Sequence, residues 1–314
     1  MKVGIAGIGA FGLKHLEAIA CIDGVEVAGI TGGRDAARLG EVAHRFKIPK
    51  VLASLEECLA LPGLDAMILC GPTQVHAPQA LTCLQAGKHV QVEIPMADNL
   101  ADARALVAKQ RETGLVAMAG HTRRYNPSHQ WIHQRIRRGE LMLQQMDVQT
   151  YFFRRTNVNA EGQPRSWTDH LLWHHACHTV DLFQYQTGEV VQQVHAMQGS
   201  LHPELGIAMD MSVQMKMASG ALCTLSLSFN NQGPQGSFFR YICDKGTYVA
   251  RYDELLDGEG KAIDVSDVDV SLNGIELQDR EFFAAICEGR EPRSGVASVL
   301  PAYETLNRIE KTLK

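Results

Sequence analysis

The sequence lacks several features that would place it in a specialised class of protein. It has no apolar run near the ~18 residues that a membrane span needs, it has no long basic run, and its formal net charge at pH 7 is −5. We therefore expect neither a membrane nor a nucleic acid as a partner. None of the eight cysteines belongs to a C-x-x-C pair, and most lie in apolar stretches. This pattern favours reduced thiols and a cytoplasmic protein. The first predicted strand follows the start of the chain directly, so we expect no signal peptide.

What the chain does have is length and apolar content, with 314 residues of which 45% are hydrophobic. This is enough for about two packed domains. No low-complexity linker or internal repeat interrupts the sequence. We expect a dinucleotide-binding domain over residues 1–121 and a substrate-binding and oligomerisation domain over residues 122–314, with the C-terminal helix able to pack back on the first domain.

A glycine turn near the start of the chain is the strongest motif. A predicted strand over residues 3–6 runs into Gly7, Gly9 and Gly12, and a predicted helix covers residues 11–20. In the G-x-G-x-x-G turn the first glycine allows a tight turn, the second lets the backbone approach a pyrophosphate, and the third lets helix and strand pack closely. The helix start would hold the phosphates. The alternative is a glycine-rich turn without a ligand, but the strand before it and the helix after it favour dinucleotide binding.

The end of the second predicted strand, over residues 25–30, indicates which dinucleotide binds. NAD-binding folds usually have a carboxylate there for the ribose 2′-hydroxyl. Here Thr31, Gly32, Gly33 and Arg34 follow the strand. A guanidinium can pair with a 2′-phosphate, so the sequence favours NADP over NAD. The alternative is that Arg34 is a solvated residue at the start of the next helix, and the neighbouring Asp35 weakens the charge argument.

Strands and helices then alternate up to residue 121, which predicts an α/β fold with a doubly wound parallel sheet of the Rossmann type. Ligands of such sheets bind beyond the carboxyl ends of the strands. That edge would bring together Pro72, Thr73, Glu93, Pro95 and His121.

The pattern changes after residue 121. Residues 127–138 and 171–186 have helical patterns, and residues 145–153 and much of 190–252 have strand patterns with alternating polarity. This predicts an α+β domain built on an open, mainly antiparallel sheet with one covered face. The stripe of Met209, Met211, Met215 and Met217 fits the core of that sheet. Helices over 276–288 and 296–313 are expected to close the fold.

Several further motifs, taken together, resemble a known family over the whole length of the chain. Besides the glycine turn, they are Pro72-Thr73-x-x-His76, Ala86-Gly87-Lys88-His89-Val90, Glu93-x-Pro95, His178-x-x-Asp181-Leu182 and Gly289-Arg290-Glu291-Pro292. The chain resembles the glucose–fructose oxidoreductase and inositol dehydrogenase family. The resemblance implies a dehydrogenase with a nicotinamide cofactor, no metal, and a homodimer or higher homo-oligomer.

Two positions depart from the usual family pattern. The family commonly has a lysine where this chain has Ile94, and often an aspartate where it has His174. Runs such as QVEIPMAD, GHTRRYNPSHQ and PRSWTDHLLWHHACHTVDLF are similar to one bacterial branch of the family that shares both departures. That branch uses NADP to oxidise the cyclic hemiacetal of a dicarboxylic ring-cleavage product in the catabolism of aromatic compounds.

The predicted helix after residue 170 supplies candidates for a catalytic base. His170, His174 and His178 are spaced at i, i+4 and i+8, with His175 beside them, so an α-helix would bring the three near one face. Histidine suits proton transfer near neutral pH. We expect the base to be His178 or His174, with the choice open. Chance spacing and a zinc site are alternatives, and zinc ranks lowest because hydride transfer does not need it.

Cationic residues would hold a dicarboxylic substrate, because guanidinium groups bind carboxylates bidentately. A solvated surface charge is the alternative for each arginine. The residues expected to contact the substrate are Arg123, Arg124, His121, Arg154, Arg165, Trp167 and Arg240.

The remaining expectation concerns the cofactor contacts and the alternatives to this function. Residues expected to bind NADP are Gly7, Gly9, Ala10, Phe11, Gly12, Thr31, Gly32, Gly33, Arg34, Cys70, Pro72, Thr73, His76, Glu93 and Pro95. A sugar or cyclitol dehydrogenase of the same family is one alternative, against which Ile94 argues. A non-catalytic NADP-binding sensor is the other.

Overall fold

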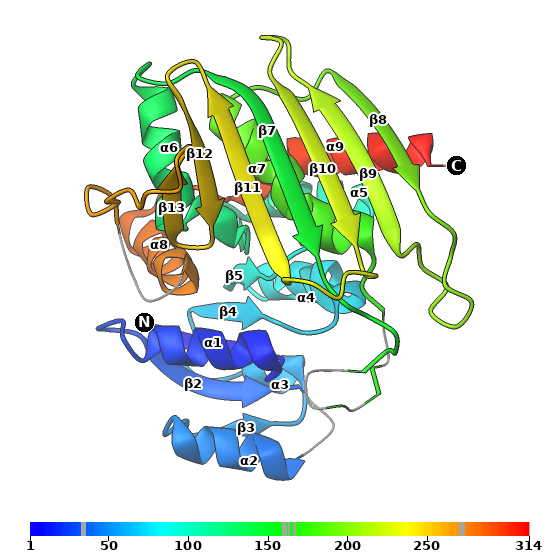
Figure 1. The fold of residues 1–314 in the computed structure, drawn as a ribbon. Helices are drawn as coiled ribbons and strands as arrows, with labels where there is room; N and C mark the ends of the chain where they lie inside the picture. The colour runs from blue at the N-terminus through cyan, green and yellow to red at the C-terminus, as the bar shows by residue number, and fades with distance from the viewer. Residues whose placement is uncertain (33–35, 159–161, 163, 166–167, 270–273, 314) are drawn as a thin grey trace. The chain divides into compact units, whose positions relative to one another are not determined.

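The computed structural model describes residues 1–32, 36–158, 162, 164–165, 168–269 and 274–313. Over these residues the chain forms two compact units (Figure 1), which are taken one at a time below. The first comprises Met1–His121 and Ile275–Leu300, and the second comprises Thr122–Gly274 and Pro301–Lys314. The division into domains at residue 121 stays a prediction; in the structure, Ile275–Leu300 groups with the first unit.

A parallel sheet forms the centre of the first unit. Within the described residues it has six strands in the order β3-β2-β1-β4-β5-β6, and each neighbouring pair is parallel. The strands are β1 (Lys2–Ala6), β2 (Glu26–Thr31), β3 (Val51–Leu52), β4 (Ala66–Leu69), β5 (His89–Val92) and β6 (Ala117–Ala119). Strand order reverses between β1 and β4, so the predicted doubly wound α/β fold is confirmed.

Helices cover the two faces of this sheet (Figure 1). Two of their boundaries follow from local chemistry. Asn99 accepts a hydrogen bond from the Asp102 amide at the start of α5, and Gly114 ends that helix in the left-handed conformation. Phe282 and Phe283 of α8 pack in the same core as Ile5 of β1, so a distant segment completes the unit. The helices are α1 (Ala10–Ile19), α2 (Ala36–Arg45), α3 (Leu55–Leu59), α4 (Thr73–Gln85), α5 (Leu100–Thr113) and α8 (Gly274–Glu288).

The second unit contains an open sheet. In the described part of the chain it has seven strands in the order β13-β12-β11-β7-β10-β9-β8. Only β7 and β10 pair in parallel there, and the other neighbours are antiparallel. The predicted mainly antiparallel sheet is therefore confirmed. The strands are β7 (Leu143–Tyr151), β8 (Gln193–Gln198), β9 (Asp210–Lys216), β10 (Leu222–Ser228), β11 (Gly236–Cys243), β12 (Gly246–Arg251) and β13 (Glu254–Asp257).

One face of this sheet is covered and the other is open (Figure 1). Burial alternates residue by residue along β9 and β10. Met209, Met211, Met215 and Met217 are all buried, which confirms their predicted place in the core. Helices α6 (Pro127–Arg137) and α7 (Cys177–Thr187) belong to this unit, and α9 (Val296–Thr312) begins in the first unit and continues into it. Among the described residues, no helix combines the length and the apolar character needed to cross a bilayer.

Candidate active site

The glycine turn between β1 and α1 has the geometry that a dinucleotide requires. Gly7 has a φ of +99°, and a Cβ there would lie 2.6 Å from the Cys70 backbone. A Cβ on Gly12 would lie 2.0 Å from the carbonyl oxygen of Gly7. At Gly9, by contrast, a Cβ would meet no described atom within 4 Å. Two glycines are thus needed for packing, while Gly9 leaves open space where a pyrophosphate could approach the backbone.

Of the predicted cofactor residues after β2, only some lie in the described part of the chain. Thr31 is buried at the end of the strand, and a Cβ on Gly32 would lie 2.9 Å from the Gly7 nitrogen. Gly32 therefore packs against the glycine turn. Gly33 and Arg34 lie outside the described residues, so the expected contact between Arg34 and a 2′-phosphate stays a prediction.

The ends of β4 and β5 bring together other predicted cofactor residues. His76 lies in α4 with one ring nitrogen 2.8 Å from the Pro95 carbonyl oxygen and the other 2.9 Å from that of Gly71. It therefore links the two loops that follow these strands. Pro72 is the N-cap residue of α4, and Thr73 is buried in its first turn. These contacts give the carboxyl edge of the sheet a defined shape.

A buried ionic cluster lies behind this edge, formed by His15 of α1, Asp279 of α8 and Glu93 after β5. His15 Nδ1 lies 2.9 Å from both carboxylate oxygens of Asp279, and its Nε2 lies 3.2 Å from Glu93 Oε1. Burial lowers the pKa of His15, but the Asp279 carboxylate outweighs this and holds the pKa well above its usual value. Sequence reasoning missed His15 and Asp279. The only local signal was a histidine three residues after Gly12.

The histidine-rich segment of the second unit differs from its prediction. Residues Leu171–Ala176 form a π-helical turn, η2, and α7 begins only at Cys177. His170 precedes the turn in extended conformation with φ −122° and ψ 163°. The expected single α-helical face with His170, His174 and His178 is therefore wrong, because the wider π turn changes the spacing of side chains. Such turns are frequent at functional sites.

Asp169, just before this turn, lies in contact with several basic side chains. Arg154 binds both of its carboxylate oxygens, and Arg165 Nη1 lies 3.0 Å from Oδ1. His175 Nε2 lies 3.2 Å and His174 Nε2 3.9 Å from Oδ2. Burial raises the pKa of Asp169, but its histidine and arginine neighbours outweigh this and bring it far below the usual range. The sequence analysis did not single out Asp169, whose partners come from separate segments.

The charge of this Asp169 cluster argues for an anionic ligand. The nitrogen and oxygen atoms of Asp169, His174 and His175 lie within 4.8 Å of one another, as in a metal site. However, both Asp169 oxygens already accept hydrogen bonds from guanidinium groups. A divalent cation would have to bind next to Arg154 and Arg165, whereas a carboxylate would be attracted to the same groups.

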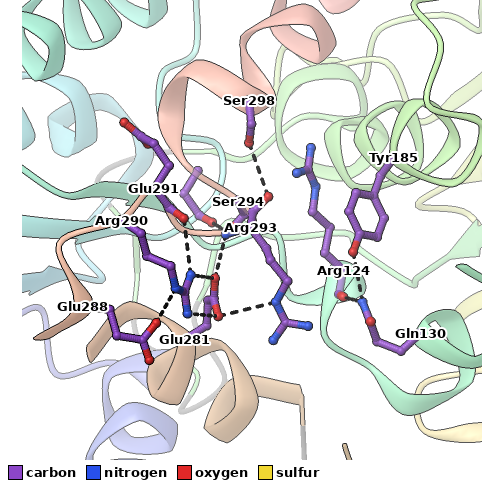
Figure 2. Close-up of polar contacts among 11 residues, drawn as sticks. Arg124, Gln130, Tyr185, Glu281, Glu288, Arg290, Glu291, Arg293, Ser294 and Ser298 are labelled. Carbon is purple, nitrogen blue, oxygen red and sulfur yellow. Dashed lines mark hydrogen bonds and ion pairs between the residues drawn. The ribbon is translucent and has the colours of Figure 1, made fainter. Parts of the chain in front are cut away.

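The neighbouring arginines Arg123 and Arg124 have different environments. Arg124 Nε and Nη2 lie 2.8 and 2.6 Å from the two Asp181 oxygens, and both side chains are buried. Arg123 lies over the ring of Tyr252, and its Nη1 donates to Asn126 Oδ1 at 3.3 Å. Figure 2 shows that the Gln130 side-chain amide donates a hydrogen bond to the backbone carbonyl oxygen of Arg124. Arg124 thus has a buried carboxylate as its direct partner, while Arg123 is bonded by a neutral amide and has the Asp253 carboxylate only as a nearby charge.

The other predicted site residues differ in burial and in how far the structure describes them. Arg240 is exposed in β11 and pairs in register with Asp147 of β7. His178 is partly buried in the first turn of α7, and His121 is fully buried. Trp167 lies outside the described residues. Their expected contacts with a substrate stay predictions.

The Gly289–Pro292 motif has a structural role in the first unit. Arg290 binds Glu281 through Nη1 at 2.8 Å and Nη2 at 3.1 Å, and binds Glu288 through Nε at 2.5 Å (Figure 2). Arg293 donates its backbone amide to the same Glu281. These contacts fix the connection between α8 and α9, so the motif marks the fold rather than the chemistry.

Comparisons with known proteins agree with this geometry. A profile of the oxidoreductase family with an NAD-binding Rossmann fold matches residues 1–121, and one of bacterial oxidoreductase C-terminal domains matches residues 127–269. The 4-carboxy-2-hydroxymuconate-6-semialdehyde dehydrogenase of Sphingobium sp. is 62% identical over 314 residues, which cover 100% of this chain and 99% of that protein. The myo-inositol 2-dehydrogenase of Thermotoga maritima is 26% identical over 71% of this chain and 66% of its own length.

A solved structure supports the fold as well. Levoglucosan dehydrogenase in complex with NADH and L-sorbose superposes with a TM-score of 0.86 at 17% identity, covering 99% of this chain and 96% of that one. The fold and the glycine turn define a nicotinamide-dependent oxidoreductase of two units. The chain belongs to the oxidoreductase family with the NAD-binding Rossmann fold that includes the inositol dehydrogenases, and the resemblance inferred from its motifs is confirmed.

Proposed function

We propose that this protein oxidises the cyclic hemiacetal form of 4-carboxy-2-hydroxymuconate-6-semialdehyde to 2-pyrone-4,6-dicarboxylate with NADP as the oxidant. The observation that carries the proposal is the 62% identity, over the full length of both chains, to the Sphingobium dehydrogenase named for that substrate. The step belongs to the protocatechuate 4,5-cleavage route of lignin-derived aromatic catabolism, and we propose a cytoplasmic homodimer.

NADP is preferred to NAD in this proposal because Gly32, Gly33 and Arg34, rather than a carboxylate, stand directly after β2. The bound nicotinamide supplies the hydride acceptor. The open space at Gly9 and the start of α1 would take the pyrophosphate. Cys70, Pro72, Thr73, Glu93 and Pro95 would lie along the nicotinamide end of the site.

The base that removes the hemiacetal proton is His174 or His178 in this proposal. Support for His174 comes from Asp169, whose carboxylate stabilises a positive charge that develops on a nearby imidazole. Asp169 also hydrogen-bonds His175 and would act as a positioning residue for this pair of rings. His178, in the first turn of α7, is the alternative base.

The carboxylates of the substrate would be bound by arginines. Arg154 and Arg165 give the Asp169 cluster an excess of positive charge. Arg123 adds a guanidinium that donates to the neutral Asn126 and lies near Tyr252 and Asp253. Arg240, His121 and Trp167 complete the proposed substrate contacts. Arg124 is the weakest candidate, because Asp181 holds its charge.

The test is a spectrophotometric assay of cofactor reduction. The product of protocatechuate 4,5-cleavage is mixed with the protein and NADP+ or NAD+, and the pyrone product is identified by chromatography. We expect fast reduction of NADP+, slower reduction of NAD+, and one pyrone formed per cofactor reduced. Faster reduction with inositol or glucose would favour a cyclitol or sugar dehydrogenase. Binding of NADP without reduction by any of these compounds would favour a sensor and contradict the proposal.

A further inference from the structure

The π-helical turn η2 contains three consecutive ring side chains whose surroundings differ. Trp173 is 2% exposed, and its ring nitrogen donates to Glu310 Oε1 of α9 at 3.2 Å. His175 Nε2 lies 3.2 Å from Asp169 Oδ2. His174 stands between them in the chain, with its Nε2 3.9 Å from the same Asp169 oxygen. This candidate base therefore has one neighbour bonded to α9 and one neighbour bonded to Asp169.

The conformation of η2 indicates that contacts outside the turn stabilise it. π-Helical turns are rare in proteins, so a chain seldom adopts one without tertiary support. The backbone amide of His174 donates to the His170 carbonyl oxygen at 3.3 Å, which is a long bond. The side chains that anchor η2 to its surroundings thus help to set where its histidines lie.

On the His175 side, the support comes from the sheet. The His175 ring centroid lies 5.2 Å from that of Phe152, which follows β7, and 5.2 Å from that of Phe229, which follows β10. These aromatic contacts and the Asp169 carboxylate hold the ring from several directions. This side of the turn already belongs to the proposed substrate site.

On the Trp173 side, the support comes from the C-terminal helix. The Trp173 ring centroid lies 6.4 Å from that of Tyr303, which is fully buried in α9. The same helix is bonded to the loop before β8, because Arg308 donates to the carbonyl oxygens of Val191 and Gln192 at 2.5 and 2.6 Å. Residues Pro301–Lys314 and η2 belong to the same compact unit. Helix α9 therefore gives Trp173 a fixed partner.

We propose that Glu310, through its hydrogen bond to Trp173, positions the histidines of η2 and of the start of α7 for proton transfer. A carboxylate is a stronger acceptor than a neutral group, so it holds the indole firmly. Misplacement of a reacting group by about 1 Å can cost about 100-fold in rate, so the C-terminal helix influences turnover through the turn. The inference rests on the proposed function, in which one of these histidines is the base.

The experiment compares kcat and KM for the semialdehyde with NADP+ in variants of this contact. We expect Glu310→Ala and Trp173→Phe each to lower kcat about tenfold and to change KM less than about twofold. The double variant should be no slower than the slower single variant, because both changes break the same contact. Glu310→Gln keeps an oxygen acceptor and should recover most of the loss. Lys311→Ala, at the next and exposed position of α9, should keep the wild-type kcat.

The amount of folded enzyme is measured for each variant by NADP+ titration and by thermal denaturation, and kcat is given per folded molecule. A variant that is less stable but keeps the wild-type kcat would show a purely structural contact and overturn the inference. Independent losses in the double variant, or a Glu310→Gln as slow as Glu310→Ala, would overturn it too. If Trp173→Phe does not fold, the two Glu310 variants give the same test.

Each of these results leaves the proposed function intact, because the wild type would still form the pyrone. A wild type that fails to oxidise the semialdehyde would instead overturn the proposed function, and this inference with it.

Discussion

Two ionic clusters, one in each unit, differ in composition and in burial. In the first unit His15 stands between Asp279 and Glu93, and the three side chains are at most 9% exposed. In the second unit Asp169 binds Arg154 and Arg165 and lies beside two histidines, with its partners up to 23% exposed. In the first cluster His15 lies between two acids, and His76 is a further imidazole that stabilises ionised Glu93. The second cluster has more cationic than anionic side chains, which suits an anionic substrate.

Removing the central cation of the first cluster should have the largest effect on stability. His15→Leu leaves Asp279 and Glu93 buried without their shared partner, and breaking such a pair costs about 3–5 kcal/mol. Urea denaturation would measure this as a lower midpoint with an unchanged slope. His44→Leu, at an exposed position of α2, is the control. A loss no larger than in this control would contradict the ionic account of the cluster.

Removing the central anion of the second cluster should affect catalysis more than stability. Asp169→Asn keeps the shape but leaves the histidines without a carboxylate, and we expect turnover to fall by about 100-fold. The cluster is less buried than the first, so the free energy of unfolding should change less than in His15→Leu. Asp210→Asn, at an exposed carboxylate of β9, should retain activity. Full activity in Asp169→Asn would remove this cluster from the mechanism.

The two clusters should also respond to pH in opposite directions. The folded pKa of His15 is raised, so its contribution to stability is complete below the unfolded value of about 6.5 and is lost as pH rises through the folded pKa. The folded pKa of Asp169 is lowered, so its contribution is complete above about 3.9 and is lost as pH falls through the folded pKa.

Denaturation of the wild type, His15→Gln and Asp169→Asn across pH tests this pair of signs. The stability difference between wild type and His15→Gln should shrink on the alkaline side. The difference between wild type and Asp169→Asn should shrink on the acid side. Parallel pH profiles for the three proteins would contradict the assignment of the two pKa shifts.

The smallest expected effect separates the neighbouring arginines Arg123 and Arg124. Arg123→Gln should raise the KM for the dicarboxylic substrate by about tenfold with little change in stability, because one charge-assisted contact is lost. Arg124→Gln should instead destabilise the protein, because it leaves Asp181 buried without its partner. Steady-state kinetics and denaturation of both variants would measure this, and equal KM values for Arg123→Gln and wild type would remove Arg123 from the substrate site.

The parts of this account that the sequence could predict depend on local rules. Short apolar runs predict the strands of the parallel sheet, and alternating polarity predicts those of the antiparallel one. The glycine turn follows from steric limits at Gly7 and Gly12 that no other residue meets. The strand order of a doubly wound sheet then locates the cofactor edge. These features need only nearby residues, so a single sequence was enough.

The two ionic clusters could not be predicted, for two different reasons. His15 and Asp279 are 264 positions apart, and only the packing of α8 into the first unit brings them into contact. Asp169 is close to His175 in sequence, but the π-helical turn of η2 sets their contact. Its spacing differs from the α-helical spacing that the histidine pattern suggests. The contacts of Asp279 and Asp169 therefore depend on the tertiary fold and not on a local sequence pattern.

A rapid-mixing measurement of a single turnover tests the role of the Asp169 cluster most directly. Enzyme loaded with NADP+ is mixed with the semialdehyde, and the reduced nicotinamide is followed by absorbance in wild type, Asp169→Asn and the control Asp210→Asn. We predict that Asp169→Asn slows hydride transfer by about 100-fold, while Asp210→Asn keeps the wild-type rate. A wild-type rate in Asp169→Asn would contradict the account.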